Sequence, residues 1–320
     1  MTGKATGPNA DPGEARPGWT CTLMLPAGTE ANTRIGRLVL TGSAAKVKRS
    51  SIDDSRAILA TALCALADAD LRLDLLVTPA GFLDVKHGTG WSGSKGWHTS
   101  TADFTELADR ARAAVPSLIT PEVLSLADGT VGHLVLGIDI WPTEGKRPYG
   151  ETACMVGVPN GSVIHVTGKS FPNSEQQGHL IREPDLANHM CDVEGKRVAI
   201  LVCHDFAAWH PRGIAARRGT RKAVGDEFNE LIAREAPTIV LHLPHTLEKV
   251  RTWAPAWSTL AGRDSGRLRT GTSAIRYRTL GGRHTPAVPL NARVLAGTGW
   301  GGRVVDIVVH DPGAWPDAPR

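Results

Sequence analysis

The sequence has few cysteines, and their arrangement would not build a disulfide or zinc framework. Five are scattered over 320 residues and none forms a CxxC pair. Disulfide-rich domains and zinc ribbons depend on closely paired cysteines, so neither class is expected. We therefore predict reduced thiols. The five are Cys21, Cys64, Cys154, Cys191 and Cys203.

Long hydrophobic runs and an excess of one charge are also missing. No window approaches the roughly 18 consecutive apolar residues that cross a bilayer, and residues 1–18 lack the apolar core of a secretory leader. The chain has 36 Lys and Arg against 32 Asp and Glu, a net charge of +4. Such a mild excess gives no strong case for nucleic acid. We expect a cytoplasmic protein with no membrane partner and no specific nucleic-acid partner.

The composition is that of an ordinary globular protein, with 41% hydrophobic and 21% charged residues. The length is enough for one large core. Residues 1–18 are rich in Gly, Pro, Ala and charge, which predicts a disordered tail. We predict a single domain over 19–312 and a short C-terminal tail over 313–320.

Apolar runs bounded by turn signals predict strands, and Ala- and Leu-rich segments predict helices. Asn160-Gly161 between two apolar runs is a strong hairpin signal. Residues 84–101 are polar and glycine-rich, which indicates a loop. Early alternation of strands and helices, with hairpins later, favours an α/β layered domain with a mixed sheet. Predicted strands are 37–40, 73–78, 134–140, 153–158, 162–166, 197–202, 238–243, 271–277, 293–296 and 304–309, and predicted helices are 57–67, 102–114, 223–235 and 253–260.

The most strand-like run of the chain, 197–202, stops abruptly at Cys203. A residue at such a strand end can be held in a sharp turn at the edge of the sheet, as in a nucleophile elbow. A thiol there attacks as the thiolate, and the N–H of His204 would be a donor to a developing oxyanion. Taken alone, the position also fits a buried structural cysteine.

Ordered segments around this cysteine resemble the motifs of the nitrilase superfamily of carbon–nitrogen hydrolases. The run VAILVCHD at 198–205 resembles its nucleophile motif, a hydrophobic strand followed by Cys, a variable residue and Asp. The run GKSFP at 168–172, followed by Glu175, resembles its catalytic-lysine segment, and Lys169 precedes Cys203 by 34 positions. The run DLLVTPAGFL at 74–83 resembles the first motif, but Ala80 stands where that motif has Glu.

Two later segments, 239–244 and 271–275, also match in order, so the resemblance covers about residues 36–310. It implies a four-layer α-β-β-α sandwich with mixed sheets and no cofactor. It also implies that Cys203 attacks a small amide or nitrile, that Lys169 and the His204 N–H stabilise the oxyanion, and that Glu175 supports the site. By analogy, and because exposed sheet edges tend to be covered, we expect a homodimer or larger assembly.

Alanine cannot move a proton, and losing a general base costs about 10²–10⁴-fold in rate. Three explanations stay open: a catalytically impaired binding or regulatory domain, a base supplied by another residue, or a thiolate maintained by Lys169 alone. A Cys-dependent acyltransferase is a further alternative. The candidate substitute bases are Asp84, His87, Glu144 and His245.

His242 and His245 flank a strand end that should lie beside Cys203. We interpret them as histidines lining the pocket, and His245 as the first substitute base to test. No metal site is expected, because the neighbouring Cys203 and His204 side chains rarely converge on one ion. Trp91 and Trp97 would form a lid or an interaction surface. A basic cluster would attract an anion or simply be solvated: Arg212, Arg217, Arg218, Arg221 and Lys222.

Overall fold

The structure is a computed structural model, and it describes most of the chain between residues 19 and 310. The segment 1–18, predicted as a tail, is described only at Ala5–Thr6, which form a short strand. The predicted tail 313–320, the predicted strand 293–296 and Glu144 lie outside the described residues. The described ranges are 5–6, 19–25, 35–41, 51–87, 91–143, 148–245, 253–263, 268–276, 298–301 and 304–310.

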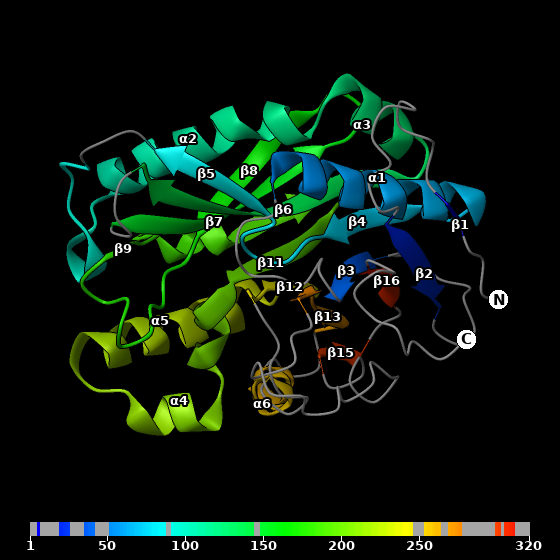
Figure 1. Cartoon of the computed structure of the whole chain (residues 1–320). Helices are drawn as coiled ribbons and strands as arrows, with labels where there is room; N and C mark the ends of the chain where they lie inside the picture. Colours follow the sequence, from blue (N-terminus) through cyan, green and yellow to red (C-terminus); the bar gives the residue numbers. More distant parts are fainter. Residues whose placement is uncertain are drawn as a thin grey trace, which may run out of the picture.

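Two mixed sheets form the centre of the molecule (Figure 1). The spatial order of the larger sheet is β1 (Ala5–Thr6), β2 (Thr20–Met24), β16 (Val304–His310), β3 (Ile35–Thr41), β4 (Leu73–Val77), β6 (Val131–Pro142), β7 (Tyr149–Gly157) and β8 (Ser162–Gly168). Three short strands flank that path: β14 (Ile275–Arg276) on β3, β5 (Leu83–His87) on β6 and β9 (Leu180–Ile181) on β7. The smaller sheet runs β10 (Met190–Val193), β11 (Lys196–Val202), β12 (Ile239–Leu243), β13 (Thr270–Ser273) and β15 (Gly299–Gly301).

Helices cover the outer face of each sheet. Against the larger sheet lie α1 (Ile52–Asp68), α2 (Thr101–Leu118) and α3 (Pro121–Ala127), and α5 (Gly219–Glu235) and α6 (Ala254–Arg263) pack against the smaller one (Figure 1). The remaining helical segments are α4 (Pro211–Ala216) and the 3-10 turns η2 (Gly96–His98), η3 (Leu186–His189) and η4 (Cys203–Ala208).

The strand period explains why the sheets stack. Successive side chains of a strand point to opposite faces. In β11, Val198, Ile200 and Val202 join the apolar cluster between the two sheets. Ala199 and Leu201 face the other way and join the cluster under α5 and α6. Both faces of β11 are therefore buried, and the layers run helix, sheet, sheet, helix.

This arrangement confirms the predicted α-β-β-α sandwich with mixed sheets. The hairpin predicted at Asn160-Gly161 joins β7 to β8, and Gly161 has the positive φ of 65° that this turn requires. The predicted strand at 197–202 is β11, and it pairs in parallel with β12.

Two predictions about elements were wrong. The segment 84–101 was expected to be loop throughout, but its start belongs to β5, which pairs in parallel with β6. The run 271–277 was expected to be one strand, but it breaks at Ala274 and changes sheet. β13 pairs with β12 in the smaller sheet, and β14 pairs with β3 in the larger one. Apolar residues on both sides of the break conceal such a crossing from a sequence pattern.

Helix α1 begins in a capping box and also supports the turn after β4. The Ser51 side chain accepts from the backbone N–H of Asp54, whose carboxylate accepts from the Ser51 N–H. One turn later, Ser55 Oγ donates to the carbonyl oxygen of Phe82 at 2.6 Å. The turn that carries Ala80 is thus tied to a well-capped helix. Within the described part of the chain, no helix is long and apolar enough to cross a membrane.

Candidate active site

Cys203 lies in a sharp turn at the end of β11. Its φ is +50°, a left-handed value that non-glycine residues adopt rarely and mostly at sites over-determined by their surroundings. The surroundings here are buried hydrogen bonds. His242 Nε2 lies 2.8 Å from the Cys203 carbonyl oxygen, and His242 Nδ1 lies 2.9 Å from Ser273 Oγ. Burial lowers the pKa of His242 to about 4, so the ring is neutral and donates through Nε2 to that carbonyl.

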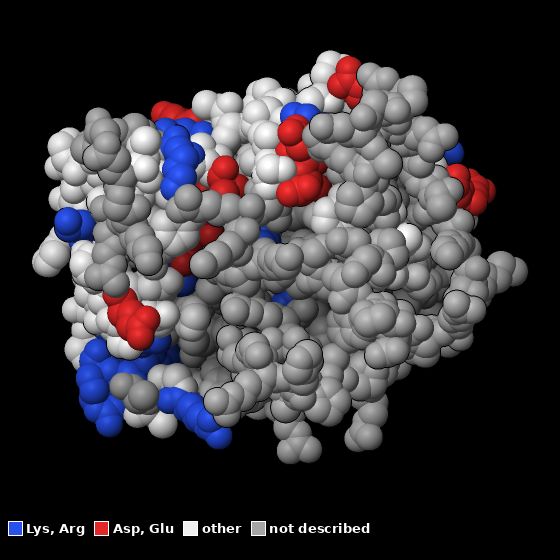
Figure 2. Space-filling view, in the orientation of Figure 1, with Lys and Arg blue, Asp and Glu red and all other residues white. Residues whose placement is uncertain are grey.

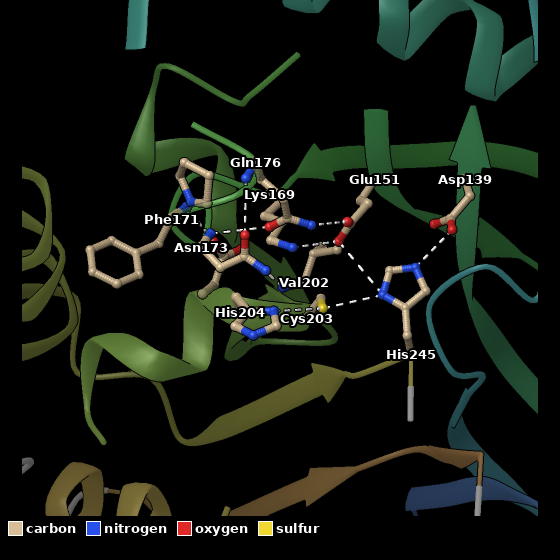
Figure 3. Close-up of polar contacts among 12 residues, drawn as sticks. Asp139, Glu151, Lys169, Phe171, Asn173, Gln176, Val202, Cys203, His204 and His245 are labelled. Atoms are coloured by element: carbon tan, nitrogen blue, oxygen red, sulfur yellow. Dashed lines mark hydrogen bonds and ion pairs between the residues drawn. The ribbon is translucent and has the colours of Figure 1, made fainter. Parts of the chain in front are cut away.

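Asp205 joins this turn to the segment that carries Lys169. Its Oδ2 accepts from the N–H of Val202 at 3.0 Å. Its Oδ1 accepts from the N–H groups of Ser170 and Phe171 at 2.9 and 2.7 Å. Lys169 directly follows β8, so one buried carboxylate holds the nucleophile strand and the lysine segment together. Figure 3 labels Lys169 and Phe171 of the lysine segment and Val202 of the nucleophile strand.

Lys169 is paired with a carboxylate that the motifs did not indicate. Its Nζ lies 2.8 Å from Glu151 Oε2, and the two side chains are 0% and 3% exposed. Glu151 is on β7, and its backbone carbonyl accepts from the Lys169 N–H at 2.9 Å. Gln176 Nε2 donates to Glu151 Oε1 at 2.9 Å. Lys169 is therefore a buried ammonium with a fixed partner (Figure 3).

His245 reaches the sulfur from the other side. It follows β12 and Pro244, and its Nδ1 lies 3.2 Å from Cys203 Sγ. Its Nε2 lies 2.7 Å from Asp139 Oδ2 on β6. A line of three groups results, sulfur to imidazole to carboxylate, as Figure 3 shows. Nucleophile, base and orienting acid in that order is the general logic of a catalytic triad.

Register explains how the two carboxylates come together. Asp139 and Glu151 are direct cross-strand partners of the antiparallel pair β6–β7, so both side chains lie on the same face. Opposed like charges destabilise a sheet. Here each acid has its own cation, His245 for Asp139 and Lys169 for Glu151. His245 Nδ1 also lies 3.7 Å from Glu151 Oε2.

These charges set the state of the thiol. Burial opposes ionisation of Cys203, but Lys169, His245 and His204 outweigh burial and hold its pKa well below the usual value. Burial also opposes the charged form of His245, but Asp139, Glu151 and the thiolate raise the pKa of His245 well above its usual value. The stable pair near neutral pH is therefore a thiolate beside an imidazolium. His204 adds a second contact, with Nδ1 3.3 Å from Cys203 Sγ.

The structure brings together Cys203, His204 and His245 from the predicted residues. Lys169 is connected to them by Glu151, whose Oε2 lies near both Lys169 Nζ and His245 Nδ1. Ala80 is wholly buried, and its N–H donates to the carbonyl of Pro244 at 3.3 Å, next to His245. A Cβ added at the following Gly81 would lie 2.8 Å from Asp139 Oδ2.

Two predicted carboxylates form no hydrogen bond with Cys203. Glu175 was expected to support the site, but it is exposed, and its backbone N–H donates to Asn173 Oδ1. The next residue, Gln176, makes the contact with Glu151 instead. Asp84 accepts from Trp141 Nε1 at 3.3 Å, and burial together with Asp139 raises its pKa to about 6. His87 ends β5.

The two tryptophans and one arginine of the basic cluster are at least partly buried. Trp91 and Trp97 are half-buried beneath Arg110 and Arg182, whose guanidinium carbons lie 5.8 and 5.2 Å from the ring centres. Arg217 of the basic cluster is buried and donates to the Ala208 carbonyl. Lys and Arg still gather on the surface near α4 and the start of α5, at the lower left of Figure 2. The exposed members of the cluster are Arg212, Arg218 and Lys222.

Sequence reasoning missed Asp139 and Glu151. Both sit inside apolar strands, Asp139 in LVLGIDI and Glu151 in ETACMVG. A lone carboxylate in a run that is otherwise buried is an expensive placement unless it is paired. That was the available signal, and it would have marked both residues as candidates.

Fold and site together define a class: an α-β-β-α sandwich with an ionised thiol on a strand end, a paired lysine and a histidine–carboxylate relay. No family model matches the sequence, and no curated protein matches it. Solved structures similar in fold include amidases of Nesterenkonia. A cysteine-to-alanine variant of the AN1 amidase, named as a member of the nitrilase superfamily, has 15% identity and a TM-score of 0.43, covering 78% of this chain and 79% of that one.

Two further structures come from the same source. An amidase from Nesterenkonia sp. has 18% identity and a TM-score of 0.43, with 79% and 80% of the two chains covered. An AN1 amidase variant with the acetamide moiety of fluoroacetamide added covalently to its active-site cysteine has 17% identity and a TM-score of 0.44, covering 79% and 78%. With TM-scores this low, no residue role is carried over from them to this chain.

Proposed function

We propose that this chain is a nitrilase-type carbon–nitrogen hydrolase that cleaves a small amide through a covalent intermediate on Cys203. The observation that carries the proposal is the 3.2 Å contact between Cys203 Sγ and His245 Nδ1, with Asp139 on the far nitrogen at 2.7 Å. In this proposal His245 is the proton acceptor that Ala80, which replaces the glutamate of the first motif, cannot be. In this proposal His245, and not Asp84 or Glu175, is the base.

The first half-reaction breaks the C–N bond. The thiolate of Cys203 attacks the carbonyl carbon, a C–S bond forms, and the carbonyl electron pair moves onto oxygen. The ammonium of Lys169 and the N–H of His204 stabilise that oxyanion. The His245 imidazolium gives its proton to the leaving nitrogen, and ammonia or an amine departs from a thioester.

The second half-reaction uses the same histidine as a base. Neutral His245 takes a proton from water, the resulting hydroxide adds to the thioester carbon, and the C–S bond breaks. A carboxylic acid leaves, and the thiolate and imidazolium are restored. Asp139 holds the ring and its charge through both steps, as a carboxylate does in other triads. The balance is amide plus water to acid plus amine.

The direct test compares His245, which contacts the sulfur, with His98, which is exposed in η2. His245→Gln should lower kcat on small aliphatic amides by about 10²–10⁴-fold. His98→Gln, at an exposed position in η2, should leave kcat unchanged. Cys203→Ala should abolish turnover and the thioester seen by intact-protein mass spectrometry.

The alternative of a catalytically impaired binding domain makes the opposite forecast. Cys203 would then react with iodoacetamide no faster than a free thiol at pH 7, and wild-type protein would turn over no member of a broad amide and nitrile panel. Either result would end the hydrolase proposal. An acyltransferase would instead consume the amide only when an amine acceptor is added, with little hydrolysis in its absence.

A further inference from the structure

Three side chains that bind soft divalent metals converge at the candidate site. Among the described residues, Glu151, Cys203 and His245 form the group whose donor atoms all lie within 4.8 Å of one another. Thiolate, imidazole and carboxylate are the three ligand types that zinc takes in proteins. We did not predict this set from the sequence, because the candidate ligands there were Cys203, His204, His242 and His245, and Glu151 was not among them.

The separations suit a shared ion. Zinc binds sulfur at about 2.3 Å and nitrogen or oxygen at about 2.0–2.2 Å, so tetrahedral ligands lie about 3.3–3.6 Å apart. Cys203 Sγ and His245 Nδ1 are 3.2 Å apart, and His245 Nδ1 and Glu151 Oε2 are 3.7 Å apart. Two of the three distances between donor atoms therefore differ from those of a zinc site by only a few tenths of an ångström.

The second ring nitrogen of His245, Nε2, has the kind of partner that it has in metal sites. Histidines that bind a metal almost always give their other N–H to a carboxylate or carbonyl, which fixes the tautomer and raises ligand basicity. Here Asp139 Oδ2 lies 2.7 Å from His245 Nε2. That contact leaves Nδ1, the nitrogen facing Cys203 and Glu151, as the one that can carry a metal.

One neighbour opposes a resident ion. The Lys169 ammonium is 2.8 Å from Glu151 Oε2, the same oxygen that would bind the metal. A divalent ion there must share that oxygen with a positive charge. Binding should therefore be reversible, unlike that of a structural zinc closed by four protein ligands.

We propose that Glu151, Cys203 and His245 form a reversible binding site for zinc-class divalent ions, and that occupancy inhibits the enzyme by capping its nucleophile. Binding itself needs no catalytic activity; the inhibitory consequence rests on the proposed hydrolase function. The ion takes the sulfur lone pair and the imidazole nitrogen that the reaction uses.

The test uses cadmium as the probe, because a cadmium–thiolate bond gives a charge-transfer band in the ultraviolet. Titration of the chelator-treated wild-type protein should produce this band, and Cys203→Ala should remove it. Cys64→Ala, at a half-buried thiol in α1, is the matched control and should retain it. Asp139→Asn should weaken binding about 10–100-fold, the usual cost of losing a carboxylate behind a histidine ligand.

A second measurement does not depend on variants that fold poorly. Zinc should slow alkylation of Cys203 by iodoacetamide in wild-type protein, followed by peptide mass spectrometry, and excess chelator should restore the rate. Absence of the band in wild type, or its persistence in folded Cys203→Ala, would overturn the metal site. The hydrolase proposal is tested separately by turnover of the metal-free protein, so either can fail while the other stands.

Discussion

At the scale of single residues, two acids lie near the thiol and its histidine, although Ala80 stands where the resembled motif has glutamate. Asp139 and Glu151 stand opposite each other on β6 and β7, and each is neutralised by a different cation. The imidazole lies between one of these acids and the thiol. Proton transfer at Cys203 can therefore pass through His245, although Ala80 offers no acceptor.

The Asp139–His245 contact predicts a specific change in pH dependence. Activity needs the thiolate, so it rises through the lowered pKa of Cys203, and it needs the imidazolium, so it falls as pH rises through the raised pKa of His245. Asp139→Asn removes a charge that raises the His245 pKa. The descending limb should then move to lower pH, and kcat/KM should fall by about 10²–10⁴-fold.

The measurement is the pH profile of kcat/KM for wild type and Asp139→Asn. Asp128→Asn, at the exposed end of α3, serves as the control and should leave both the rate and the profile unchanged. A variant at Asp139 with a wild-type profile would show that this carboxylate does not act through His245.

Ala80 gives a second prediction, which concerns stability. The residue is wholly buried, and a Cβ placed on Gly137 would lie 2.6 Å from its Cα, so little space surrounds it. Ala80→Glu would add a third carboxylate without a cation of its own, and uncompensated buried charges cost about 3–5 kcal/mol. Ala80→Gln has nearly the same size without the charge.

Denaturant unfolding of both variants separates the two costs. At neutral pH, Ala80→Glu should be less stable than Ala80→Gln, and the gap should close as pH falls and the added carboxylate is protonated, because burial raises its folded-state pKa. Restoration of the family glutamate should not raise kcat. A stable and faster Ala80→Glu would instead mean that the motif position still serves as the base position.

Some residues of the candidate site could be predicted from the sequence, and others could not. Cys203 and Lys169 could be predicted because each sits in a short contiguous motif. His245 was only one of four candidate bases, since nothing local shows which way it points. Asp139 and Glu151 act together because of strand register, and register across a connection of uncertain length is invisible to a local pattern.

At the scale of elements, Asp205 controls how β8 and β11 meet. Its carboxylate accepts three buried backbone N–H groups, two after Lys169 and one at Val202. Asp205→Ala leaves all three without that acceptor, at about 1–3 kcal/mol for each buried group left unsatisfied, less any relaxation. The variant should lose about 2–5 kcal/mol of stability, and it should lose kcat because the Lys169 segment is no longer held.

Urea unfolding and kcat on the same samples check this prediction. Asp185→Ala is the matched control: Asp185 is exposed and caps η3 through the Ala187 N–H alone. Its loss should cost about 1 kcal/mol, the usual price of a cap, without changing kcat. An Asp205→Ala protein as active and stable as that control would show that the two segments are held by other contacts.

Element prediction succeeded where an element was long and apolar. β11 and the β7–β8 hairpin lie where periodicity and turn chemistry placed them. The strands β5, β9 and β10 were missed because they are only two to five residues long, and they owe their conformation to pairing with a neighbour rather than to their own sequence. The passage of the chain from the smaller sheet to the larger one at Ala274 was missed because the strands on both sides of it are buried, so their sequences look alike.

At the scale of the whole molecule, the two sheets are joined by polar contacts as well as by the apolar layer between them. Arg37 on β3 is 3% exposed and donates to the carbonyls of Ser273 and Thr298 at 3.1 and 2.9 Å. Its Nε forms an ion pair with Asp306 on β16. One guanidinium thus links the larger sheet to β13 of the smaller one. A homodimer or larger assembly stays a prediction from exposed sheet edges.

Removal of this guanidinium should destabilise the sandwich as a unit. Arg37→Met keeps the apolar stem but leaves Asp306 without its cation and removes the guanidinium from the carbonyls of Ser273 and Thr298. The Thr298 carbonyl keeps the Ser273 N–H as a donor. Breaking a buried pair from one side costs about 3–5 kcal/mol. Arg112→Met, whose pair with Asp109 on α2 is exposed at 47% and 65%, should cost at most about 1 kcal/mol.

The double variant Arg37→Met with Asp306→Asn decides which contact dominates. Asparagine removes the charge that the single variant leaves unpaired, so the double variant should recover part of the lost stability if the ion pair is the main term. If the carbonyls of Ser273 and Thr298 dominate, the double variant should be no more stable than Arg37→Met. The free energy of unfolding of each variant is measured by urea denaturation, monitored with two spectroscopic probes. A near-neutral Arg37→Met would mean that the apolar layer and the other polar links, such as that of Asp205, hold the sheets together without this guanidinium.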